Sequence, residues 1–145
     1  MITGFLHLHS ALRWVVLALL LVTFVKAAIG MSKKTSDFKS QAKLGLFTMI
    51  ALHIQLVIGL TLFFDGHWAE YTVDGYTRFF MMEHTPMMII AVILGTLGHS
   101  LSKRAKDVAT KFKRQVIFFG ISLVLIFGMI PWPFMRNFGE VFDWI

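Results

Sequence analysis

Four long apolar segments, separated by polar breaks, constrain this chain more than any other feature. They cover residues 4–30, 44–64, 78–101 and 114–131. As a helix, each can cross a hydrocarbon core about 30 Å thick, which takes about 20 residues, or somewhat fewer if the bilayer adapts. The runs are continuously apolar rather than alternating, which disfavours a membrane barrel. The sequence therefore predicts an all-α integral membrane protein, with an up-down-up-down four-helix bundle over residues 1–131.

The composition agrees with a membrane protein. Apolar residues make up 57% of the chain and charged residues 15%, whereas about a quarter of a soluble domain is charged. The first segment is expected to stay as a helix, because no basic stretch precedes it and no Ala-x-Ala cleavage pattern follows it. Residues 132–145 are rich in aromatic side chains and are predicted to form an interfacial tail that anchors the chain or docks on a partner.

Basic residues flank two of the three connections. The first is bordered by Lys26, Lys33, Lys34, Lys39 and Lys43, and the third by Lys103, Arg104, Lys106, Lys111, Lys113 and Arg114. The second, residues 65–77, carries acidic residues and neither lysine nor arginine. The positive-inside rule then predicts a multi-pass protein of the bacterial inner membrane with both termini on the outer, periplasmic side. The net charge of +6 reflects this topology and contact with anionic lipid, and nucleic acid is not expected as a partner.

Histidines inside the apolar segments are the main candidates for a functional site. Cysteine is absent from the sequence, which excludes disulfides, iron–sulfur clusters and thiolate metal sites. His9, His53 and His84 lie within predicted spans. Ionisable side chains are unfavourable in hydrocarbon, so such residues indicate a function by default. We therefore treat all three as candidate metal ligands.

Depth in the membrane favours two of these histidines as a pair. Measured from the outer ends of their helices, His9 and His84 lie about 8 and 9 Å deep, and His53 about 16 Å. The first and third helices are diagonal partners in a simple bundle, so the two imidazoles could clamp a flat haem b between them. Gly95 shares the helix face of His84 and leaves room for a ring or for a closely packed helix.

Three polar residues accompany the histidines. Arg13 lies one turn below His9 and needs an anion, which Glu83 or a haem propionate could supply. Gln55 lies near mid-span and could bond a quinone carbonyl or another helix.

Pro86 predicts an irregular backbone beside His84, whether it starts the helix or kinks it.

A copper site is a second interpretation of the third segment. Met81, His84 and Met88 have the spacing of one α-helical face, and thioether ligands select Cu(I). Methionine also fills irregular gaps in apolar packing. Because the methionine pattern is not repeated elsewhere, copper is the less favoured cofactor.

Four motifs carry a family resemblance. They are HLHSALRW at 7–14, HIQLVIG at 53–59, MEH at 82–84 and MIPWP at 129–133. With them the chain resembles small four-helix proteins of Bacteroidetes-type bacteria that are described as cytochrome b-like, and it is more distantly similar to b561-type and superoxide-oxidase-type cytochromes. The resemblance implies haem b and quinone-linked electron transfer, with His9, His53 and His84 as the positions to test.

The fourth segment departs from a two-haem arrangement because it contains no histidine. The sequence thus supports one bis-histidine haem near the outer face, which would exchange electrons with quinol or with a respiratory complex. Whether the protein is an enzyme stays open. The alternative from another class is a haem-free accessory subunit of a larger membrane complex.

Overall fold

The computed structural model describes residues 2–65 and 78–132. Its elements follow in the order α1 (Ile2–Ser32), α2 (Lys39–Asp65), η2 (Phe79–His84), α4 (Thr85–Arg104) and α5 (Val108–Met129). The π-helix η2 leads directly into α4, so they form one span, and no strand occurs in these two stretches. All four helices are long and apolar enough to cross a membrane, which confirms the predicted all-α membrane fold.

The helices extend further than the apolar segments at their basic ends. α5 begins at Val108 rather than at residue 114, and α4 ends at Arg104 rather than at residue 101. Lysine and arginine are good helix formers, so the basic turns continue the helices beyond the apolar limit. The fourth predicted segment was therefore too short at its start and ran two residues too long at its end.

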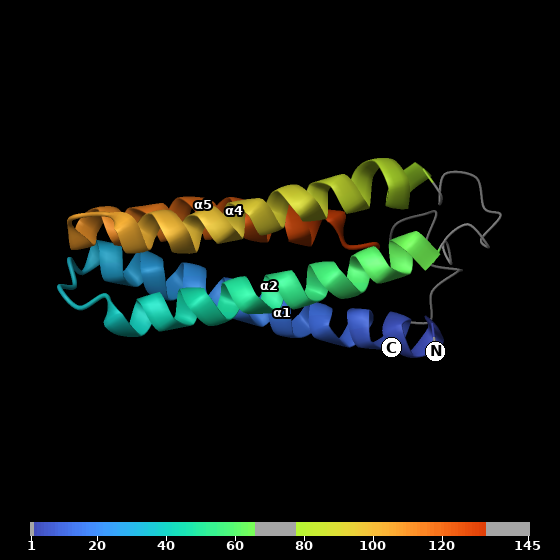
Figure 1. Ribbon diagram of the computed structural model, residues 1–145. Coiled ribbons are helices and arrows are strands. Elements are labelled where there is room, and N and C mark those ends of the chain that lie inside the picture. Colours follow the sequence, from blue (N-terminus) through green and yellow to red (C-terminus); the bar gives the residue numbers. More distant parts are fainter. Residues whose placement is uncertain (1, 66–77, 133–145) are drawn as a thin grey trace.

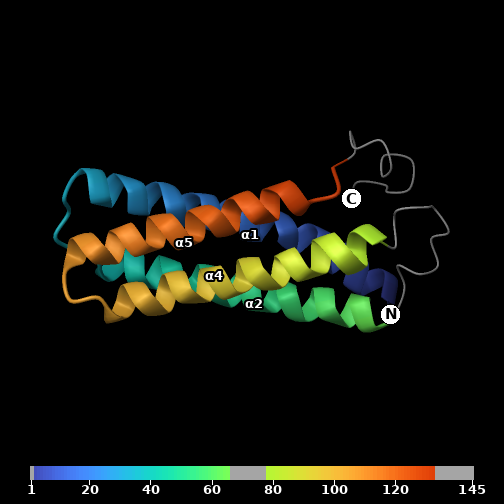
Figure 2. The same ribbon diagram turned by 90° about the horizontal axis from the view of Figure 1, so that it is seen from above.

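Successive helices run in opposite directions and lie together in one bundle (Figures 1 and 2). α1 packs against α2 and α5, and α4 packs against the same two helices, so α1 and α4 are diagonal partners. The two basic connections, at residues 33–38 and 105–107, lie at the same end of the bundle (Figure 1). His9 and His84, near the starts of their spans, are therefore at the opposite end.

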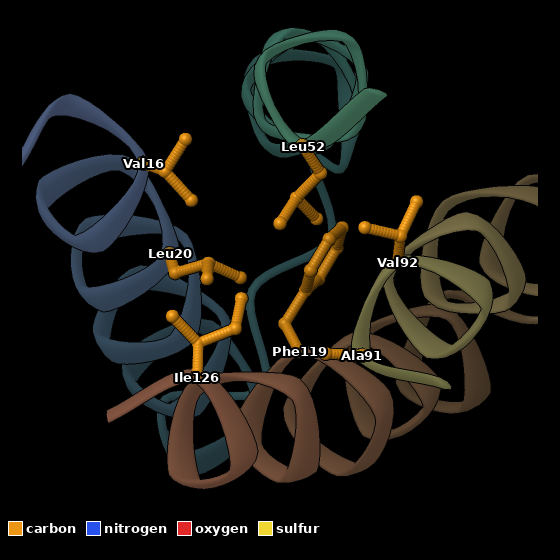
Figure 3. Close-up of a cluster of buried hydrophobic side chains, with 7 residues drawn as sticks. All are labelled: Val16, Leu20, Leu52, Ala91, Val92, Phe119 and Ile126. Atoms are coloured by element: carbon orange, nitrogen blue, oxygen red, sulfur yellow. The ribbon is translucent and has the colours of Figure 1, made fainter. Parts of the chain in front are cut away.

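The middle of the bundle is filled by apolar side chains from all four helices (Figure 3). Phe119 points from α5 into the centre and is fully buried, as are Leu20 and Leu52. A Cβ added at Gly95 would run into Leu52 and would lie 3.8 Å from Phe119. Of the two uses predicted for the space at Gly95, the structure shows close packing.

A set of buried polar side chains joins the helices nearer the basic end. We call it the Gln41 network; its members are Thr23, Gln41, Thr48, Ser102 and Gln115. Gln41 Nε2 donates to the Thr23 carbonyl at 2.9 Å and to Gln115 Oε1 at 2.8 Å. Gln115 Nε2 donates to Ser102 Oγ at 3.4 Å, and the hydroxyls of Thr23 and Thr48 are 2.6 Å apart. Such interhelical hydrogen bonds help membrane helices associate.

The start of the third span is irregular, as Pro86 predicted. η2 covers Phe79–His84, and the backbone N–H of Thr85 donates to the carbonyl of Phe80, five residues earlier. Proline has no N–H to donate and its ring clashes with the carbonyl four residues before it, here that of Met82. The wider π-turn accommodates both effects without ending the helix, because Thr85 keeps right-handed helical angles.

Candidate functional site: a histidine pair

His9 lies between α1 and a recessed part of α2. A Cβ added at Gly59 would lie 2.9 Å from His9 Cε1, so only glycine lets the ring pack this closely on α2. One turn earlier on α2, Gln55 Nε2 donates to the backbone carbonyl of His9 at 2.8 Å. The imidazole Nδ1 of His9 is buried and has no hydrogen-bond partner. His9 is thus held by its backbone, with one ring nitrogen still unsatisfied.

His84, the last residue of η2, is oriented by the end of α5. Its Nδ1 donates to the carbonyl oxygen of Met129 at 2.9 Å. Met129 is the last residue of α5, where helix carbonyls have no intrahelical partner. The rings of Phe79 and Phe80 lie 5.9 and 5.4 Å from the imidazole centroid. This bond fixes the proton on Nδ1 and leaves Nε2 with its lone pair.

The structure brings His9, His84 and Arg13 into one neighbourhood. The two imidazoles come from diagonal helices and are close enough for their charges to interact, and Arg13 interacts electrostatically with each. Arg13 Nη2 also donates to Ser10 Oγ at 3.1 Å, and its guanidinium lies 5.2 Å from the centre of the Trp14 ring. His9 and His84 therefore lie near each other, as expected from their depth in the membrane. Metal ligation by the two residues stays a prediction.

His53 lies apart from this pair. Its side chain is exposed, Nδ1 donates to the Met49 carbonyl at 2.7 Å, and Nε2 is 3.4 Å from Thr96 Oγ1. It precedes Gly59 by six residues, and at about 100° per residue this puts it on a different face of α2. The structure therefore does not place His53 with the two predicted ligands.

Glu83 and Met81 also face outward. Glu83 is exposed and its Oε1 lies 3.8 Å from Arg78 Nε. Met81 is 41% exposed, whereas Met88 packs against the central core. The predicted common face of Met81, His84 and Met88 assumed α-helical spacing, which the wider π-turn through His84 changes. Copper binding at these residues stays a prediction.

Gln55 combines a helix contact with an open acceptor. Its Nε2 bonds the α1 backbone, as one of its two predicted uses required. Its Oε1 is buried and has no partner. A quinone bond at this oxygen stays a prediction.

Several groups around the pair were not identified from the sequence. Gly59 follows Gln55 by four residues, so its place on the same face could have been recognised from helical spacing. The hydrogen bond that the Met129 carbonyl accepts from His84 had no such signal, because every residue has a backbone carbonyl and the sequence does not single one out. Phe79 and Phe80 carry no polar group that would single them out in the sequence, yet Phe79 is buried beside His84.

The donor set suits a macrocycle better than a bare ion. Within residues 2–65 and 78–132, no group of three or more histidine, aspartate or glutamate side chains could hold a metal ion. Sites for a bare zinc ion generally use three or four protein ligands. Haem iron receives four equatorial nitrogens from its porphyrin and needs only axial ligands from the protein. Two imidazoles are enough for that role.

No protein-family model, no curated protein and no solved structure matches the chain. The function is therefore inferred from the histidine pair and its surroundings.

Proposed function

We propose that this protein is a small membrane-embedded b-type cytochrome in which His9 and His84 are the axial ligands of one haem. The observation that carries the proposal is the approach of two partly buried imidazoles from diagonal helices, one already oriented by a backbone carbonyl. Ligating histidines usually donate their second ring N–H to a carbonyl or carboxylate, which fixes the tautomer and raises ligand basicity. The bond from His84 to Met129 has this form.

The surrounding residues also suit haem. Phe79 and Phe80 supply apolar ring surface beside His84, and Arg13 supplies a cation near both imidazoles. A guanidinium can hold a haem propionate by paired hydrogen bonds, which relieves the cost of a cation within a span. The core around Phe119 is filled, so the proposed site is confined to the end of the bundle. When bound, haem would supply reversible one-electron transfer.

The distribution of charge supports an inner-membrane location with the histidine pair on the periplasmic side. Apart from Arg13 and Arg78, every lysine and arginine in the described part of the chain lies toward the end with the two short connections. By the positive-inside rule this end faces the cytoplasm. One haem near the outer face does not carry electrons across about 30 Å of hydrocarbon. We propose exchange with a quinol or with a respiratory subunit on that side.

An absorption spectrum of the purified protein tests the proposal. We expect the sharp visible bands of a six-coordinate b haem on reduction. His84→Ala should abolish these bands because it removes a ligand. His53→Ala is the matched control, since that exposed imidazole is bonded elsewhere, and it should leave the spectrum unchanged.

Two results would contradict the proposal. A colourless wild-type protein with full helicity would instead favour the haem-free accessory subunit, and metal analysis of the same sample would test copper. Loss of the bands in His53→Ala with retention in His84→Ala would move the ligand away from the pair.

A further inference from the structure

Two polar atoms of residues in the histidine site are unsatisfied. They are His9 Nδ1 and Gln55 Oε1, both buried and without a hydrogen-bond partner. Leaving such a group unpaired is unfavourable, so most buried polar atoms are satisfied. Among the buried side-chain atoms without a partner in residues 2–65 and 78–132, Gln55 Oε1 is the one carbonyl oxygen.

The Gln55 side chain is anchored next to the His9 ring. Its Nε2 is 2.8 Å from the backbone carbonyl of His9, which fixes the amide at that residue. Gly59, one turn further along α2, lies against the ring itself: a Cβ added at Gly59 would be 3.5 Å from His9 Nδ1. The unsatisfied amide oxygen and the unsatisfied ring nitrogen thus occupy the same short stretch of the α1–α2 contact.

From this geometry we infer that Gln55 is a positioning residue for His9, whose Nδ1–H it accepts when the ring is a ligand. The inference rests on the proposed haem site. An imidazole that ligates through Nε2 keeps its proton on Nδ1, and in a buried site that proton needs an acceptor. Met129 provides the acceptor for His84. Gln55 Oε1 provides the corresponding acceptor for His9 once the ring or the amide rotates.

The hydrogen bond has measurable consequences for the iron. Donation from Nδ1 makes the imidazole a stronger electron donor, which stabilises ferric over ferrous iron. Loss of the acceptor should therefore raise the midpoint potential. It should also weaken cofactor binding by about 10- to 100-fold, the usual effect of removing a residue that orients a metal ligand.

The test uses two variants at one position and a control on the same helix. Gln55→Leu removes the acceptor at similar volume, and we expect a higher midpoint potential and weaker haem binding. Gln55→Glu keeps an acceptor, and we expect a potential at or below that of the wild type. Thr61→Val is the control, because Thr61 is exposed and its hydroxyl bonds the Val57 carbonyl of its own helix, and it should change neither quantity.

The outcomes separate this inference from the proposed function. Wild-type protein without haem overturns the haem site and the role of Gln55 together. Haem-loaded wild type whose potential and affinity are the same in Gln55→Leu overturns the positioning role alone. Shifts of equal sign in the Leu and Glu variants also overturn it, because they indicate a packing effect. If Gln55→Leu does not fold, a Glu variant with a raised potential gives the same negative answer.

Discussion

Two regions of the bundle use a glutamine to bridge neighbouring helices, and they differ in how completely the amide is bonded. In the Gln41 network, Gln41 donates to Thr23 and Gln115, and the Gln115 amide continues to Ser102. At the histidine site, Gln55 donates to the His9 backbone while its oxygen has no partner. Bonded buried amides hold helices together. An amide with a free oxygen beside an imidazole is a group available for binding.

The largest expected effect is the contrast in stability between two identical substitutions. Gln115→Leu removes the partner of Gln41 Nε2 inside the bundle, so we expect a loss of about 1–3 kcal/mol in the free energy of unfolding. Gln55→Leu removes one interhelical bond, to a His9 carbonyl that keeps its intrahelical bond, together with an oxygen that was already unsatisfied. In haem-free protein we expect a smaller loss, of up to about 1 kcal/mol. Unfolding in mixed micelles, followed by circular dichroism, measures both.

Equal losses of stability in the two variants would contradict the distinction between Gln115, which holds helices together, and Gln55, whose oxygen is available for binding. A larger loss of stability in Gln55→Leu would reverse that distinction. The haem absorption bands should persist in Gln115→Leu whenever the bundle stays folded, because the Gln41 network lies away from His9 and His84.

A second contrast uses two glycines of α2. A Cβ at Gly45 would lie 2.6 Å from Gln115 Nε2, so Gly45→Ala should displace the amide and destabilise the bundle by about 1–3 kcal/mol. A Cβ at Gly59 would lie 2.9 Å from His9 Cε1. Gly59→Ala should shift the imidazole by a few tenths of an ångström and reduce haem occupancy with a smaller loss of stability. Haem content per protein and the unfolding midpoint distinguish the two outcomes.

The result that would break this contrast is loss of haem in a folded Gly45→Ala protein with normal occupancy in Gly59→Ala. Ligand geometry would then depend on the network rather than on the recess in α2.

The sequence predicted the helices and the approach of His9 to His84 for a clear physical reason. Apolar length determines a span, basic flanks determine which ends lie together, and the rise per residue then determines depth. Two histidines at one depth on diagonal helices were therefore expected to meet. These arguments need no knowledge of side-chain packing.

Other residues were harder to place because depth does not determine the helix face. His53 has a membrane position consistent with ligation, yet it faces outward toward Thr96. The face of Met81 was misjudged because Pro86 makes the preceding turn a π-helix, in which α-helical spacing fails. The bond from His84 to the Met129 carbonyl depends on where α5 ends in space, which no side chain in the sequence indicates.

The smallest expected effect concerns a helix cap at the basic end, outside the spans. The Asp107 carboxylate accepts the backbone N–H of Thr110 at 2.8 Å, and this bond lowers the pKa of Asp107 below its ordinary value of 3.8. Because the folded pKa is the lower one, the stabilisation is present above pH 3.8 and is lost as the pH falls through the folded value.

Asp107→Asn keeps an oxygen acceptor but removes the titration, so its unfolding midpoint should lose this acid-dependent contribution, while Asp107→Ala should be slightly less stable at neutral pH. The unfolding midpoint of the three proteins between neutral and acidic pH measures the effect. The haem spectrum at neutral pH should be the same in all three, since the cap lies at the end opposite the histidine pair. A change of the haem spectrum in Asp107→Ala would show that the two ends of the bundle are coupled. It would contradict the separation between the basic end, which stabilises the bundle, and the histidine site, which binds the cofactor.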